Sequence, residues 1–178
     1  MPDAKKPSAA AKPKPKPKAK SIAKKSPAKK APAKKAGRGA RVVIDERHGP
    51  ADMKSAARTI MSGSSSSCTL VLVHSPGCGW CERLRPDWDA AADQLVGRQA
   101  NALEIVASKM PDLRSLSHES SSPVSQLVRL LDASDYQGGV PHIALFVPTP
   151  SGAPRVVPYS GNREAADMVR FAIGGRGR

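Results

Sequence analysis

The stretch that decides the fold of this chain is SPGCGWCERLRP, Ser75 to Pro86. Its two cysteines, Cys78 and Cys81, are separated by two residues, and Pro86 follows within the same stretch. The preceding run TLVLVH (69–74) is apolar without alternation, which indicates a strand buried on both faces. The spacing alone allows a redox centre, half of a metal site, or a pair of structural thiols.

The segment after Cys78 has the periodicity of a helix that continues to about residue 96. One face of this helix carries Cys81, Leu84, Trp88, Ala91 and Leu95, spaced by three or four residues. A helix N-terminus has free amide donors and partial positive charge, which favour a thiolate at Cys78. Cys81 points inward one turn later, so one sulfur is exposed and the other is shielded but within reach. Thiol–disulfide exchange needs this arrangement, and Pro86 should kink the helix.

The other periodic segments indicate an α/β domain over residues 41–178 with a mixed central sheet. Predicted strands cover 41–46, 69–74, 102–108, 142–147 and 155–160, and the last two form a hairpin because their connection is short. Helices should begin at Pro50, after the cap Ser122, and after the cap Asn162. The serine-rich residues 109–122 are predicted to form a surface loop, and residues 62–67 another. The expected order is β-α-β-α-β-α-β-β-α.

Residues 1–40 differ from the rest in composition and charge. They contain 14 Lys and Arg and one acid, so most of the formal charge of +14 lies here and residues 41–178 are nearly neutral. Proline and like charge predict a disordered, extended tail. The segment resembles the lysine-, alanine- and proline-rich tails of linker histones, which implies non-specific binding to DNA or another polyanion. A solubilising tail, or one that binds an anionic membrane surface or a capsid protein, is the alternative. The lysines concerned are Lys12, Lys14, Lys16, Lys18, Lys20, Lys24, Lys25, Lys29, Lys30, Lys34 and Lys35.

Residues 42–173 resemble the thioredoxin superfamily. The resemblance rests on the strand before Cys-x-x-Cys, on Pro86, on GGVPHIALF (138–146), on the hairpin that follows, and on YSGNREAADMVRF (159–171). It implies a thioredoxin-like fold, with a mixed central sheet flanked by helices, and thiol–disulfide oxidoreductase activity on disulfide-containing proteins. Cys78 would be the nucleophile and Cys81 the resolving thiol. Pro141 would be a cis-proline that shapes the substrate groove, beside Gly77, Gly79, Trp80, Val140 and His142.

Three departures from the family pattern concern the chemistry of the cysteine pair. Gly77 stands where thioredoxins and disulfide isomerases usually have Trp, and Gly79-Trp80 replaces the usual dipeptide between the cysteines. Leu72 stands where the family often has a buried carboxylate that takes the proton of the resolving thiol. The resemblance therefore predicts a working but sluggish redox centre. Trp80 either contacts the substrate or packs under a neighbouring loop, and His142 either raises the thiolate fraction or lines the groove.

Other interpretations stay open beside the enzyme. A zinc site would need two further ligands among Cys68, His74 and His142. Cys68 lies at the far end of its strand from the cysteine pair. We expect neither a metal nor a cofactor. A non-catalytic thioredoxin-fold interaction protein, associated with a virion or with chromatin, also fits the sequence. Three cysteines favour a reducing intracellular compartment, the nucleus or a virion included. No apolar run reaches the roughly 18 residues of a membrane span, and there is no secretory signal.

Overall fold

A computed structural model describes residues 39–61, 67–118, 121–149 and 154–175. Residues 1–38 and the predicted loop at 62–66 lie outside the described residues, so the expectations for the tail stay predictions. Strands in the described parts are β1 (Arg41–Ile44), β2 (Thr69–His74), β3 (Asn101–Val106), β4 (His142–Val147) and β5 (Arg155–Pro158). The α-helices are α1 (Pro50–Met61), α2 (Gly79–Gly97), α3 (Met110–Ser115), α4 (Pro123–Ala133) and α5 (Ala165–Gly174). None of these helices is long and apolar enough to cross a membrane.

The five strands form one mixed sheet in the order β1-β3-β2-β4-β5. β1, β3 and β2 are parallel, whereas β4 runs antiparallel to β2 and pairs with β5 as a hairpin. All residues of β2 and β3 are buried, because these strands lie inside the sheet with helices on both faces. The α/β class, the mixed sheet and the hairpin predicted from the sequence are confirmed.

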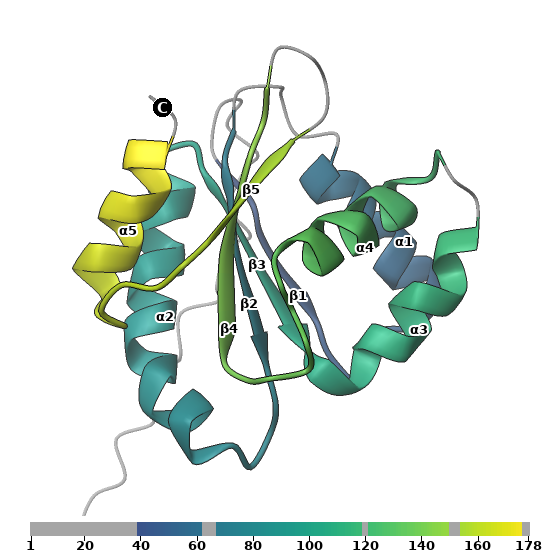
Figure 1. The fold of residues 1–178 in the computed structure, drawn as a ribbon, viewed down its shortest axis with the longest axis horizontal. Helices are drawn as coiled ribbons and strands as arrows, with labels where there is room; N and C mark the ends of the chain where they lie inside the picture. The colour runs from purple at the N-terminus through teal and green to yellow at the C-terminus, as the bar shows by residue number, and fades with distance from the viewer. Residues whose placement is uncertain (1–38, 62–66, 119–120, 150–153, 176–178) are drawn as a thin grey trace, which may run out of the picture. The chain divides into compact units, whose positions relative to one another are not determined.

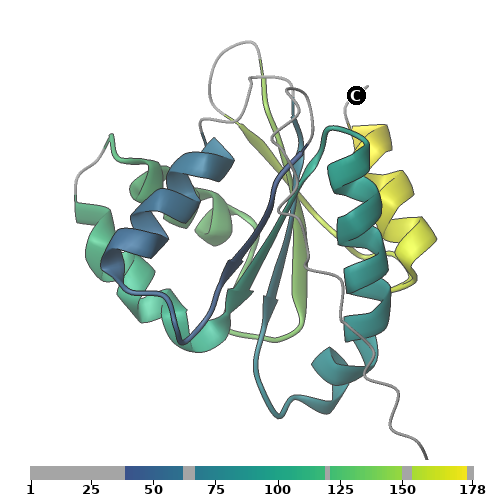
Figure 2. The ribbon, with the colours of Figure 1, turned by 180° about the vertical axis from the view of Figure 1, so that it is seen from behind.

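Two helical layers cover the sheet (Figures 1 and 2). α2 and α5 pack together on one face, and α1, α3 and α4 cover the other. Each layer has its own core, and the strand residues alternate between the two: Leu70 and Leu72 belong to the α2–α5 side, whereas Val71 and Val73 face α1 and α4. β2 ends at His74 and α2 begins at Gly79, so the cysteine segment lies at the base of α2. The first turns of α2 are offset from the rest of the helix, in line with the kink predicted at Pro86 (Figure 1).

The prediction of a surface loop at 109–122 is wrong for most of that segment. Residues 107–109 and 116–118 form short 3₁₀ turns, and α3 lies between them. Met110 and Leu113 are buried in the core beneath α4. These two apolar residues, three apart, favour a helix that buries them, although the residues around them are rich in serine. The predicted cap of the next helix is confirmed: the Ser122 hydroxyl accepts the Ser125 amide at 3.1 Å.

The predicted cap of the last helix is also wrong, because α5 begins at Ala165 with Glu164 at the cap position rather than Asn162. The Glu164 side chain makes no capping bond. Instead the carboxylate of Asp87, on α2, accepts the Ala165 amide at 3.1 Å. The cap therefore comes from a neighbouring helix in the same layer, which sequence spacing cannot show.

Candidate redox site

Cys78 lies at the point where β2 has ended and α2 begins. It is the N-cap residue of this 19-residue helix, and its Sγ accepts the Cys81 amide at 3.3 Å. Gly77 has φ +74°, a left-handed conformation that favours glycine and that turns the chain from the strand into the helix. A hydrogen bond from a backbone amide and the helix dipole both favour negative charge on the Cys78 sulfur.

The two cysteine sulfurs are joined as a disulfide, with their Cα atoms 5.2 Å apart. Cys78 is half-buried, whereas Cys81 is only 7% exposed and lies on the buried face of α2 with Leu84, Trp88, Ala91 and Leu95. The inward face of α2 predicted from the sequence is therefore confirmed. A disulfide or thiolate from solvent can approach Cys78 more readily than Cys81, which is the asymmetry that stepwise exchange requires.

The segment before β4 approaches the disulfide from the other side. The Val140–Pro141 peptide bond is cis, as expected from the sequence, and the Val140 carbonyl oxygen lies 3.9 Å from Cys78 Sγ. His142 Nε2 is hydrogen-bonded to the Ser134 hydroxyl at 2.8 Å, and its ring packs on Tyr136. Burial lowers the pKa of His142, against the opposing charge of Asp135. The lowered pKa favours the neutral imidazole, which the α4–β4 connection holds in place through Ser134 and Tyr136.

Trp80 is exposed, which excludes the alternative that it packs under a neighbouring loop. Its side chain is 64% exposed, unlike every other large hydrophobic side chain among the described residues. The guanidinium carbon of Arg83 lies 4.8 Å from the centre of the indole ring. An exposed aromatic ring with a cation on its face therefore stands between the two cysteines in sequence, on the first turns of α2.

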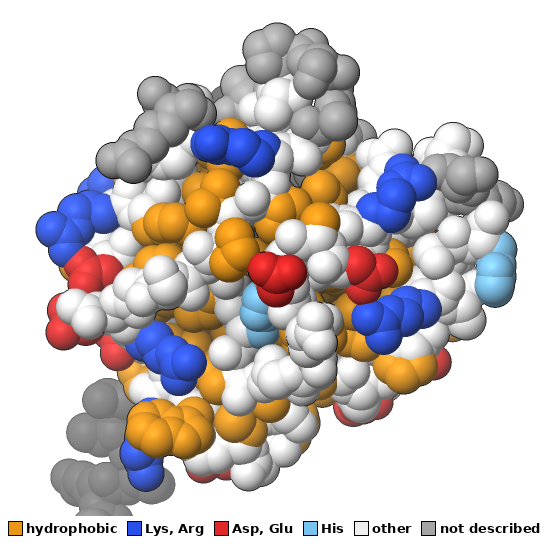
Figure 3. Space-filling model, in the orientation of Figure 1, with side chains coloured by type: hydrophobic (Ala, Val, Ile, Leu, Met, Phe, Trp, Pro, Cys, Tyr) orange, Lys and Arg blue, Asp and Glu red, His pale blue; other side chains and the backbone are white. Residues whose placement is uncertain are grey.

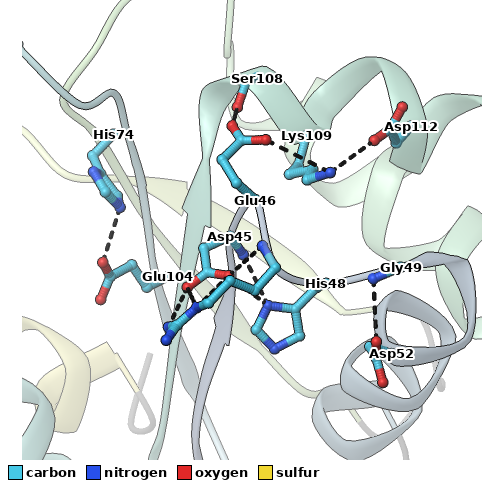
Figure 4. A network of polar contacts seen from close by, with 11 residues as sticks. Asp45, Glu46, His48, Gly49, Asp52, His74, Glu104, Ser108, Lys109 and Asp112 are labelled. Atoms are coloured by element: carbon cyan, nitrogen blue, oxygen red, sulfur yellow. Dashed lines mark hydrogen bonds and ion pairs between the residues drawn. The ribbon is translucent and has the colours of Figure 1, made fainter.

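A buried carboxylate, that of Glu104 on β3, lies beneath α2 and is 3% exposed. His74 Nε2, at the end of β2, lies 2.9 Å from Glu104 Oε1 (Figure 4). Trp88 Nε1 donates to Glu104 Oε2 at 3.2 Å, and Arg85 donates to Oε1. Both donors belong to α2, so this cluster ties the cysteine-bearing helix to two central strands.

The partners of Glu104 hold it in the charged form. Burial would raise the pKa of this carboxyl, but hydrogen bonds from His74 and Arg85 outweigh it and bring the pKa down to about 2. Arg41, on β1, adds a positive charge 3.9 Å from Oε2. A cavity of about 380 Å³ between β1, β3 and α2 is lined by these groups, so the cluster has a route to solvent.

Glu104 was not predicted from the sequence as part of the site. Leu72 occupies the place where the thioredoxin superfamily often has a buried acid, and the structure pairs Leu72 with Glu104 in register on adjacent parallel strands. Paired residues point to the same face of a sheet, here the face covered by α2. The signal that could have found it was the single acid inside the apolar run ALEIV (102–106), since an acid inside a strand buried on both faces requires partners.

The structure separates the candidates for a zinc site. Cys68 is buried just before β2, outside the disulfide and at the opposite end of that strand from Cys78. His74 is paired with Glu104, and His142 with Ser134. Among the described residues, no three His, Cys, Asp or Glu side chains are grouped so that they could hold a metal ion.

Solved structures of thioredoxin domains resemble this chain, although no protein-family model and no curated protein sequence matches it. A crystal structure of ERdj5 (form I) aligns over 75% of this chain and 14% of its own, with a TM-score of 0.50 and 18% identity. The first thioredoxin domain of mouse protein disulfide-isomerase A4 aligns over 75% of this chain and 74% of its own (TM-score 0.47, 18% identity). Chloroplastic thioredoxin z aligns over 78% and 94% (TM-score 0.47, 16% identity).

These identities are low, so the comparisons concern the fold and not the activity. This chain also spans only about half of another similar structure, the J-Trx1 fragment of ERdj5. The strand order of this chain, its mixed sheet and the position of the Cys78–Cys81 pair at the base of α2 agree with a thioredoxin-like fold. The described part of this chain has a thioredoxin-like fold, with a Cys-x-x-Cys pair at disulfide distance.

Proposed function

We propose that this protein is a thiol–disulfide oxidoreductase in which Cys78 is the nucleophile and Cys81 the resolving thiol. The observation that carries the proposal is the asymmetry of the pair. Cys78 Sγ caps α2 and accepts the Cys81 amide, while Cys81 is buried one turn further along. The pair suits a redox role because one sulfur is activated and accessible and the other is held where it can complete the exchange.

In the reductive direction the reaction has two steps. The Cys78 thiolate attacks a substrate disulfide, forming a Cys78–substrate bond and releasing one substrate thiolate. The Cys81 thiolate then attacks Cys78 Sγ, which forms the Cys78–Cys81 disulfide and releases the second substrate thiolate. Two electrons pass from the dithiol to the substrate, and the two thiol protons end on the substrate sulfurs. Oxidation of a substrate runs the same steps in reverse.

We propose further that Glu104 supplies the buried carboxylate that is missing at position 72. It lies on the same face of the sheet as Leu72, beneath the helix that carries Cys81 on its inner side. Its low pKa keeps it ionised at neutral pH, so its influence on the cysteines would be electrostatic.

The test is reduction of insulin by the full chain, with dithiothreitol as electron source. Cys78→Ser should reduce the rate to that of dithiothreitol alone, because no thiolate remains at the exposed position. Cys81→Ser should accumulate a mixed disulfide with insulin, visible on a non-reducing gel, because the second step is blocked. Cys68→Ser is the matched control and should retain activity, since Cys68 lies at the other end of β2. Activity of Cys78→Ser equal to that of the intact chain would exclude the proposal and leave a non-catalytic interaction protein.

The proposal includes the basic tail as a tether to DNA or another polyanion. Its support is compositional: 13 of the first 40 residues are Lys, and the segment contains no aromatic residue that could stack on bases. The substrates would then be disulfides in proteins near that polyanion. A reducing intracellular compartment, such as the nucleus or a virion, is the proposed location, because three cysteines are an odd number and too few for a disulfide scaffold.

A further inference from the structure

We propose that Trp80 and Arg83 form a recognition surface that selects substrate segments with an acidic residue near the reactive cysteine. The inference rests on the proposed function and names the class of substrate for that same site. Trp80 is 64% exposed beside the disulfide, and the Arg83 guanidinium stacks on its ring at 4.8 Å. Figure 3 shows a hydrophobic side chain with a basic one against it near the start of α2.

The exposed indole is costly unless something covers it. Burial of an aromatic side chain is favourable, so a segment that covers Trp80 while its disulfide reacts at Cys78 gains affinity. Exposed Trp is also the residue type most enriched among interaction hot spots. Trp80 lies on the first turn of α2, between Cys78 and Cys81 in the sequence, so its ring is close to the site of exchange.

Arg83 gives this surface its charge. It forms no ion pair with a described residue, unlike Arg41, Arg47, Arg85, Arg114 and Arg170. The nearby acids are directed elsewhere. Asp87, one turn further along α2, accepts the Ala165 amide, and Glu82 lies on a different side of the helix from Trp80, because residues two apart do not share a face.

The stacked geometry also makes Arg83 a preorganised donor. The indole restricts the guanidinium to one region of space, so less side-chain entropy is lost when a carboxylate binds. The planar guanidinium can hold a carboxylate through two parallel hydrogen bonds while it remains stacked on the ring. A segment with an apolar residue and a nearby Asp or Glu next to its cysteine therefore complements both parts of the surface.

The test uses three disulfide-linked peptide dimers that differ only in the residues two positions from the cysteine: Glu, Gln or Lys. Each strand carries a fluorophore that is quenched in the dimer, so reduction is followed as a gain of fluorescence. The full chain is first reduced and desalted, and the second-order rate constant is measured for each peptide. Charge alters the intrinsic reactivity of a peptide disulfide, so every rate is divided by that of the same peptide with dithiothreitol.

We expect the Glu peptide to react about threefold to tenfold faster than the Lys peptide, the size of effect that exposed charge pairs produce. Arg83→Gln should bring this ratio close to one, and Arg83→Glu should invert it. High salt should reduce the ratio for the intact chain. Lys54→Gln removes the same charge from an exposed position on α1, across the sheet from α2, and should leave the ratio unchanged.

The two proposals fail in different ways. If all three peptides react equally fast, or Arg83→Gln retains the preference, the acidic selectivity is wrong while the redox function stands. If Lys54→Gln changes the ratio as much as Arg83→Gln, the preference comes from the overall charge and not from this surface. If no peptide reacts, the proposed function itself is wrong and this inference falls with it.

Discussion

The carboxylate of Glu104 shows how much of this site depends on one side chain. From β3, this carboxylate contacts His74 at the end of β2, and Arg85 and Trp88 on α2. A buried charge is tolerated when each of its oxygens has a partner, and here both do. Removing the charge leaves Arg85 without its counter-ion, and leaves the ring nitrogens of His74 and Trp88 without a charged acceptor.

We predict that Glu104→Gln lowers the free energy of unfolding at pH 7 by about 2–4 kcal/mol, because it removes the charge of a buried carboxylate that pairs with Arg85 and His74. Urea denaturation followed by circular dichroism measures this loss. Glu46→Gln is the matched control: this carboxylate is largely exposed on the turn after β1, and the change should cost less than about 0.5 kcal/mol. Equal effects of the two changes would contradict the prediction.

The same carboxylate predicts a pH dependence. Its pKa of about 2 in the folded protein lies below the ordinary value of 4.5, so its contribution to stability is complete above pH 4.5. This contribution, on the order of 3 kcal/mol, is lost as the pH falls toward 2. The difference in unfolding free energy between the intact chain and Glu104→Gln should therefore be constant from pH 7 to about 5 and shrink at lower pH. A difference that stays constant down to pH 3 would show that the Glu104 charge is not the cause.

At the scale of elements, α3 is the helix that its local sequence does not predict. The segment is rich in serine, yet Leu113 is fully buried between α3 and the core that α1 and α4 share. Short helices of this kind are stabilised by packing and not by intrinsic propensity. The serines themselves bond to the local backbone, as Ser115 and Ser117 do through their hydroxyls.

We predict that Leu113→Ala lowers the unfolding free energy by about 2–5 kcal/mol, because it leaves a cavity beneath α4. Leu116→Ala, only a turn away and half-buried, should cost distinctly less. Thermal or chemical denaturation of both variants distinguishes a packed element from the surface loop that the composition suggests. Nearly equal, small losses would mean that the segment is not part of the core.

At the scale of the whole molecule, the basic segment joins the body far from the cysteines. The Gly39 amide donates to the Val96 carbonyl at 3.1 Å, and Ala40 is hydrogen-bonded to Asn101. A Cβ at Gly39 would lie 1.8 Å from the Ala100 carbonyl oxygen, so only glycine fits here. This junction lies where the parallel strands begin, whereas Cys78 follows the end of β2. The residues at which the described body begins therefore lie at the other end of the sheet from Cys78.

We predict that deleting residues 1–38 abolishes binding to duplex DNA and leaves insulin reduction unchanged. Fluorescence anisotropy with a labelled duplex, at 50 to 200 mM salt, measures the binding. For the intact chain, log K should fall with log salt by about 0.9 for each phosphate that a lysine neutralises. A salt-independent affinity, or binding that survives the deletion, would exclude the tail as the polyanion contact.

The sequence by itself determined the elements with strong local patterns. The apolar run of β2, the inward face of α2 and the Ser122 cap were predictable, because short-range periodicity and capping chemistry decide them. The cis-proline at Pro141 was expected only from the resemblance to the thioredoxin superfamily. Tertiary structure decided the rest. The cap of α5 comes from Asp87 on another helix, α3 exists because Leu113 has a core to enter, and Glu104 lies beside Leu72 only through strand register. Each depends on a contact between residues distant in sequence, and local propensity carries no record of such contacts.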